Sequence, residues 1–271
     1  LSIQLGSWAT DNSGNKTFTA NTDFTQQSLV LDGADNLTTL KNEVLEVNNG
    51  SGFVEGGSFG VGQPLPARME VGLPIGYFYG YKTDGLFQSQ EEVDAHPSQT
   101  ALGAKAAPGD IRFVDITKDG ILNSDDRTYI GDPIPDVTMG LNFTLNYKGF
   151  DFVAYAFASI GNEMVRNYER TQPNVNKLSY NLNRWTGEGT GNTVPRLTTA
   201  ATSNTIFSDF YVEDASFIRM QNLQMGYTLP EYVTEKYKIG SLRLYASVSN
   251  LFTLTNYTGY DPSASNGAPI G

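Results

Sequence analysis

Apolar and polar residues alternate with a period of two along four long segments, at 138–147, 150–160, 217–229 and 241–252. Successive side chains of a β-strand point to opposite faces, so this alternation predicts strands with one apolar and one polar face. Weaker strands are predicted at 18–31, 43–47, 68–72 and 75–83. The four clear segments run to about 10 to 13 residues, whereas strands of globular proteins usually have five or six.

Two of these segments are separated only by Lys148 and Gly149. A short connection that contains glycine is typical of a β-hairpin, so we expect segments 138–147 and 150–160 to pair. In segment 217–229, strict alternation places Arg219 and Leu223 on one face and Met220 and Asn222 on the other.

Tyrosine and phenylalanine gather near the strand ends, and the connections are short on one side and long on the other. Long two-faced strands with aromatic ends are typical of a transmembrane β-barrel, which closes its sheet because a bilayer offers no water to an open edge. A soluble β-sandwich or a β-propeller shows the same alternation. No internal repeat at a fixed period is evident, which argues against a propeller.

Two long loops are predicted, at about 84–136 and 161–209, and they are rich in Gly, Asn and Thr. Loops longer than about 15 residues inside a domain are usually functional. Both loops are therefore candidates to carry the chemistry of the protein.

Composition supports a mostly β, non-helical protein. The 271 residues are 39% hydrophobic and only 17% charged, and they include 28 Gly, 15 Tyr and 15 Phe. The net charge of −11 excludes the basic surface that nucleic-acid binding needs. Without cysteine there is no disulfide and no thiol nucleophile, and the single histidine, His96, is expected in a solvated loop. No run approaches the roughly 18 apolar residues of a membrane-spanning helix.

The sharpest local motif covers residues 115–126 and follows the spacing of an EF-hand calcium loop. Its ligand positions are filled in order by Asp115, Thr117, Asp119, Ile121 (backbone carbonyl), Asn123 and Asp126, with Gly120 at the turn. Thr at the third position and Asp at the last are weaker ligands than usual, and no helices flank the loop. The alternative is an acidic turn whose carboxylates cap backbone amides.

Other chemistry is less well marked. The 29 acidic residues allow a glycosidase-type carboxylate pair, but no spacing selects two of them, and no nucleophile elbow or phosphate loop is present. Trp185, in the second long loop, is a candidate for stacking on a substrate such as a sugar ring, with loop packing as the alternative.

Four collinear motifs resemble the C-terminal part of the SusC/RagA family of TonB-dependent outer-membrane transporters of the Bacteroidota. They are GLPIGYFYGYKTDGLF at 72–87, PGDIRF at 108–113 continuing through the calcium-like loop to IGDP at 130–133, FSDFYVEDASFIRM at 207–220, and NLFT at 250–253 running to YDP at 260–262. Their order and spacing fit from about residue 66 to 265.

The resemblance implies an antiparallel transmembrane β-barrel of about 22 strands with a plug. Residues 1–271 would form the C-terminal section of that barrel, so we expect this sequence to be part of a longer polypeptide whose N-terminal plug lies outside it. The resemblance further implies active import of oligosaccharides or oligopeptides, with no catalysis, in contact with outer-membrane lipid. The implied partners are a SusD-like surface lipoprotein and, through the missing N-terminal region, the TonB complex. The alternative is a secreted, calcium-binding β-sandwich that binds carbohydrate.

Overall fold

The computed structural model describes residues 7–10, 16–19, 30–60, 63–167 and 177–263. The chain divides into two compact units. The first, here called the sheet unit, comprises residues 1–41, 135–162 and 215–257. The second, here called the loop unit, comprises residues 42–134, 163–214 and 258–271.

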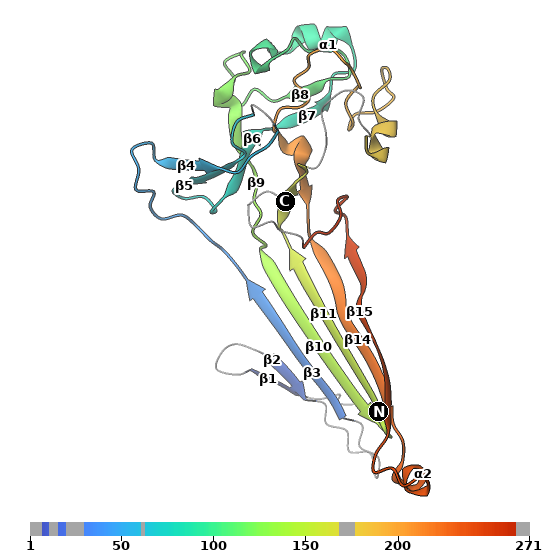
Figure 1. Cartoon of the computed structure of the whole chain (residues 1–271). Coiled ribbons are helices and arrows are strands. Elements are labelled where there is room, and N and C mark those ends of the chain that lie inside the picture. Colours follow the sequence, from blue (N-terminus) through green and yellow to red (C-terminus); the bar gives the residue numbers. More distant parts are fainter. Residues whose placement is uncertain (1–6, 11–15, 20–29, 61–62, 168–176, 264–271) are drawn as a thin grey trace, which may run out of the picture. The chain divides into compact units, whose positions relative to one another are not determined.

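The sheet unit is one antiparallel sheet of seven strands in the order β1-β2-β3-β10-β11-β14-β15. Figure 1 shows its longest strands side by side in a single layer. The strand bounds are β1 Ser7–Thr10, β2 Lys16–Thr19, β3 Val30–Thr39, β10 Val137–Tyr147, β11 Phe150–Ile160, β14 Phe217–Thr228 and β15 Arg243–Thr255.

The four strands with clear alternation are confirmed as β10, β11, β14 and β15. The predicted hairpin is confirmed as well, because Tyr147 pairs with Phe150 across Lys148 and Gly149. Both turn residues have positive φ, 48° at Lys148 and 83° at Gly149. These angles match the turn type whose twist suits a two-residue hairpin.

Strict alternation along β14 is wrong at its centre, where a β-bulge shifts the register. Ala156 pairs with Met220 and Tyr155 with Asn222, so Gln221 is left without a partner on β11. On the other side, Asn250 of β15 takes a positive φ of 51° and lies opposite this irregularity. Arg219 therefore shares a face with Asn222 rather than with Leu223, because an extra residue reverses the alternation beyond it.

With the bulge included, cross-strand pairing joins the apolar residues of four strands into one continuous face. That apolar face carries Leu141, Phe143, Leu145, Phe150, Phe152, Ile218, Leu223, Met225, Leu244, Val248, Phe252 and Leu254. Its side chains are not covered within the described chain: Met225 is 57% exposed, Leu244 61% and Leu254 60%. The opposite, polar face carries residues such as Asn142, Asn222, Gln224, Ser247 and Ser249.

The loop unit contains a four-stranded sheet, β4-β5-β6-β9, and two smaller strand pairs, β7-β8 and β12-β13. Their bounds are β4 Phe53–Gly56, β5 Ala67–Glu70, β6 Tyr77–Tyr81, β7 Thr83–Leu86, β8 Ile111–Phe113, β9 Arg127–Gly131, β12 Glu163–Val165 and β13 Val212–Asp214. Two apolar cores hold it together. One gathers Phe59, Phe78, Ile130, Val165, Phe207 and Tyr211, and the other Tyr81, Leu86, Ile111, Phe113 and Leu122.

The weaker strand predictions had mixed outcomes. Segment 68–72 is confirmed as β5, and segment 75–83 contains β6 and the start of β7. Segment 18–31 has β2 and β3 at its two ends, and residues 20–29 between them lie outside the described residues. The strand at 43–47 is wrong: Val44 exchanges backbone hydrogen bonds with Gly72 and Leu73, but no ladder continues from them.

Among the described residues, helices are few and short. α1 spans Gln90–Ala95, α2 spans Glu231–Lys236, and the other described helices are 3₁₀ segments of three to five residues. Over the described ranges, no helix has the length and apolar character needed to cross a membrane. His96 lies in the loop directly after α1, as expected, but its ring is only partly exposed and packs against Phe87 with centroids 5.1 Å apart.

Candidate functional site

A buried ion pair connects the two long loops inside the loop unit. Asp110 is only 2% exposed, and its Oδ1 and Oδ2 accept hydrogen bonds from Nε and Nη2 of Arg196 at 2.7 and 3.0 Å. The hydrogen bonds to Asp110 raise the pKa of the Arg196 guanidinium above its ordinary value. Such a two-pronged pair fixes orientation as well as distance. It therefore joins residues that lie 86 positions apart in the sequence.

Side-chain amides, rather than a further strand, form hydrogen bonds with the backbone of β8. Gln99 is 3% exposed; its Nε2 donates to the carbonyl of Ile111 and its Oε1 accepts from the amide of Phe113. Asn204 accepts from the amide of Ile111 and donates to Asp110. Because buried backbone groups need partners, these amides allow an irregular loop to pack tightly.

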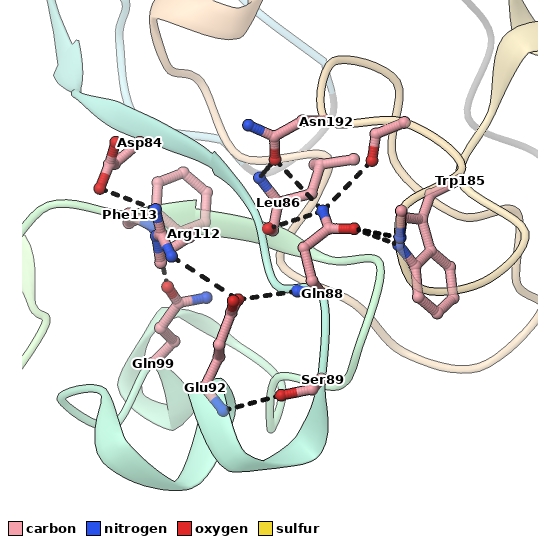
Figure 2. A network of polar contacts seen from close by, with 12 residues as sticks. Asp84, Leu86, Gln88, Ser89, Glu92, Gln99, Arg112, Phe113, Trp185 and Asn192 are labelled. Atoms are coloured by element: carbon pink, nitrogen blue, oxygen red, sulfur yellow. Dashed lines mark hydrogen bonds and ion pairs between the residues drawn. The ribbon is translucent and has the colours of Figure 1, made fainter.

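Trp185 belongs to the second long loop and bonds the first one through Gln88 (Figure 2). Its Nε1 donates to Oε1 of Gln88 at 3.2 Å, and the same oxygen accepts the amide of Gly189. The Nε2 of Gln88 donates in turn to the carbonyls of Leu86 and Gly191. The indole N–H thus bonds the Gln88 side chain, which is itself fixed by hydrogen bonds with Leu86, Gly189 and Gly191.

One edge of the Trp185 ring lies over Gly109, whose φ is 84°. A Cβ at position 109 would come within 2.8 Å of Cδ2 of the ring, so only glycine fits there. The ring is half-buried and packs against the core that contains Leu86 and Phe113. The expectation that Trp185 contacts a substrate stays a prediction, and the ring also has a packing role.

The calcium-like loop is organised around Asp126, which is fully buried. Its Oδ1 accepts from the amides of Ile116 and Thr117 and from the hydroxyl of Thr117, and its Oδ2 accepts from the amide of Asn123. Burial alone raises the pKa of this carboxyl, but hydrogen bonds from Asn123, Thr117 and Ile116 outweigh it and bring the pKa below its ordinary value.

The other predicted calcium ligands also bind backbone amides. Asp115 accepts from the amides of Lys118 and Gly120, Asp119 from Ile121, and Asn123 from Asp125. Throughout the described ranges, no group of three or more His, Cys, Asp or Glu side chains is arranged to hold a metal ion. The structure brings Asp115, Thr117 and Asp126 together through hydrogen bonds. Calcium binding stays a prediction.

Sequence reasoning missed a stack of cationic and aromatic groups on the β4-β5-β6-β9 sheet. The Arg68 guanidinium lies between the rings of Phe53 and Tyr79, at 4.0 and 3.5 Å from their centroids, and Arg127 lies 4.4 Å from the Tyr79 centroid. Glu55 bonds Arg68 at 2.8 Å and lies 3.6 Å from Arg127. These residues come from four strands, and no local sequence signal marks them.

The polar face of the sheet unit carries mostly uncharged hydrogen-bonding groups. Two of its charged members bond neighbouring strands: Nε of Arg243 donates to Asp151 at 2.9 Å, and Nε of Arg219 donates to Thr253 at 2.8 Å. A sheet with amides and hydroxyls on one face and apolar side chains on the other is typical of a barrel whose interior is polar.

Comparison with known proteins places this architecture in a class. No family model matches the chain. TonB-dependent receptor P3 of Formosa agariphila is 35% identical over 89% of this chain and 24% of its own length. TonB-dependent receptor SusC of Bacteroides thetaiotaomicron is 27% identical over 86% of this chain and 22% of its own length. The chain thus spans about a quarter of the length of the curated relatives it matches.

Solved structures show the same fold. The RagAB peptide transporter matches 95% of this chain and 27% of its own chain, with a TM-score of 0.69 and 22% identity. The RagAB peptide importer in its closed-closed state matches with a TM-score of 0.67. The all-β, antiparallel fold of a barrel section is thereby confirmed, and the sheet is open over the described strands. The curated relatives are named as TonB-dependent receptors, one of them SusC. The resemblance of this chain to the SusC/RagA family is thereby confirmed.

Proposed function

We propose that the chain is a wall section of an outer-membrane importer that takes up oligosaccharides or oligopeptides. The observation that carries this proposal is the apolar face of the sheet unit, which is exposed along four strands while the opposite face is polar. Exposed apolar surface of this extent marks a membrane or protein contact. A β-sandwich would bury that face against a second sheet.

The relatives and neighbours support the remaining parts of the proposal. The names SusC and RagAB support a two-component importer in which a SusD-like surface lipoprotein contacts the barrel. The term TonB-dependent supports energy supply through the TonB complex, by way of a region outside this sequence. The proposal includes no catalytic step and no nucleic-acid ligand.

Fractionation of the cells that make the full protein tests the proposal. The protein should sediment with outer membranes and migrate faster on a gel before boiling than after it, because closed barrels resist detergent. Deletion of the gene should abolish growth on an oligosaccharide or a peptide source, and the nutrient concerned identifies the substrate class. Recovery in the soluble fraction, with no heat-dependent shift, would refute the proposal.

We further propose that residues 115–126 bind one calcium ion, with Asp115, Thr117, Asp119, Ile121, Asn123 and Asp126 as ligands. Support comes from the spacing of oxygen donors and from the exposed position of Asp119. Calcium should protect the loop from proteolysis, and Asp119→Ala should remove that protection, because alanine offers no side-chain oxygen. Asp125→Ala is the matched control, since Asp125 is also exposed but occupies no ligand position. Equal protection in all three proteins, or none in the parent, would contradict calcium binding here.

A further inference from the structure

Two connections between long strands of the sheet unit lie at the same end of the sheet. Lys148 and Gly149 join β10 to β11, and residues 229–242, which include α2, join β14 to β15. The carbonyl of Gly149 accepts the amide of Thr228 at 2.7 Å, which ties the two connections together. Figure 1 shows α2 at this end of the strands.

Three lysines occupy these connections: Lys148, Lys236 and Lys238, here called the turn lysines. All three are exposed. In the described part of the chain none of them forms an ion pair with a carboxylate, and Lys148 instead lies 5.3 Å from the ring centroid of Tyr147. The α2 connection also carries the exposed Glu231 and Glu235, so the lysines of the two connections exceed their carboxylates by one positive charge. Because the lysines are not paired with these carboxylates in the described chain, their ammonium groups are available to an external anion.

Two of these lysines are held in a backbone conformation that favours glycine. Lys148 has a φ of 48° and Lys238 a φ of 57°. At Lys238 the end of α2 closes with hydrogen bonds from Ile239 to Thr234 and from Lys238 to Glu235, an arrangement whose left-handed residue is usually glycine. Glycine would adopt these positive φ angles with less strain, so the presence of lysine points to a role for its side chain.

Exposed aromatic residues accompany the turn lysines. Tyr232 and Tyr237 of the α2 connection are 77% and 66% exposed, and Phe150 and Tyr147 beside the hairpin turn are 53% and 41% exposed. Tyrosine concentrates where a membrane meets water, because its ring is apolar and its hydroxyl polar. Lysines that extend beyond such a belt reach the level of the lipid phosphates.

We infer that this end of the sheet binds the headgroups of anionic phospholipids, with the turn lysines contacting phosphate and the tyrosines inserting at the interface. Bacterial barrels have short turns at the periplasmic end, so the leaflet concerned is the inner one. The inference rests on the proposed function, since it requires the sheet to lie in a bilayer. It adds a lipid preference that neither the fold nor the apolar face requires.

Fluorescence quenching tests this inference in the full protein reconstituted in vesicles. The chain has no cysteine, so Tyr232→Cys offers one labelling position within it for a fluorophore. Brominated phosphatidylglycerol should quench that label about twofold more strongly than brominated phosphatidylcholine. The triple variant K148Q/K236Q/K238Q should remove the preference. The matched control, K82Q/K105Q/K177Q, removes three exposed lysines of the loop unit and should leave it intact.

A label on the apolar face separates the two hypotheses. Val248→Cys lies in the middle of β15 and should be quenched equally by both lipids. If the label at 248 is quenched while that at 232 is not, or is quenched equally by both lipids, the headgroup inference is overturned and the proposed function stands. If the label at 248 is not quenched at all, the proposed function itself fails.

Discussion

The indole ring of Trp185 covers Gly109 so closely that a methyl group at position 109 would overlap the ring. We predict that Gly109→Ala destabilises the loop unit by about 2–4 kcal/mol, from left-handed backbone strain and overpacking combined. Hydrogen exchange of the backbone around Arg196, whose amide donates to the carbonyl of Gly109 at 2.9 Å, should report the loss.

A double-mutant cycle separates the two causes. Trp185→Ala removes the ring, so the steric part of the Gly109→Ala effect should vanish in the double variant while the backbone strain remains. Strictly additive effects would mean that the ring does not press on residue 109. If Trp185→Ala weakens substrate uptake without loosening the loop unit, a ligand contact would be favoured over packing.

Removing the buried carboxylate at position 110 should loosen the connection between the long loops. We expect Asp110→Asn to cost about 2–3 kcal/mol, because Arg196 loses its charged partner and one of the two acceptor oxygens becomes an NH2 group that cannot accept. Asp84→Asn is the control, since that carboxylate is 71% exposed and pairs with Arg112; its cost should stay below about 1 kcal/mol. Thermal unfolding of the two variants should differ clearly, and similar melting would contradict the assigned roles.

The stack around Arg68 predicts that the guanidinium shape matters, and not only its charge. Arg68→Lys should cost about 1–2 kcal/mol, because a lysine cannot stack flat between Phe53 and Tyr79 while it bonds Glu55. Arg112→Lys, in a more exposed pair, should change the free energy of unfolding by less than about 0.5 kcal/mol. Equal melting temperatures for the two variants would argue against the stack as a stabilising feature.

Acid should open the 115–126 loop before the rest of the loop unit. The folded-state pKa of Asp126 lies below its unfolded value, so its contribution to stability is present above the unfolded pKa and is lost as the pH falls through the folded one. Hydrogen exchange at Ile116 and Thr117 should therefore accelerate below about pH 4.

Asp126→Asn tests the origin of that acid effect. An amide at this position cannot accept every hydrogen bond that the carboxylate accepts, and one of its sides would present N–H groups to the amide of Asn123 or Ile116. The variant should show fast exchange at neutral pH and little further change in acid. If it keeps the parent's acid response, another group controls the loop.

The long strands could be predicted because their signals, alternation and turn residues, lie within short stretches of sequence. Alternation over ten residues and a glycine turn at 148–149 are local signals, and β10 and β11 follow them closely. The bulge at Gln221 could not be predicted, because a single extra residue reverses the faces without altering the composition of the segment. Only pairing with both neighbouring strands reveals which half of β14 is out of phase.

Contacts of the candidate site escaped prediction for a different reason. Asp110 and Arg196 are far apart in the sequence, and neither lies in a pattern that marks the other. The Gln99 side chain bonds the backbone of Ile111 and Phe113 as a neighbouring strand would, and its residue type does not indicate this role. The calcium-like spacing was evident because a loop of twelve residues is local, but spacing says nothing of the backbone amides that its carboxylates bind.

The bulge opposite Asn250 sets a rule for insertions and deletions in relatives of this protein. A single-residue deletion at Gln221 alone would turn Phe217 and Arg219 toward the apolar face and Ile218 and Met220 toward the polar face. Length changes in β14 and β15 are therefore tolerated at this position only when compensating changes occur in both strands. Elsewhere in these strands, sequence length should vary by two residues or not at all.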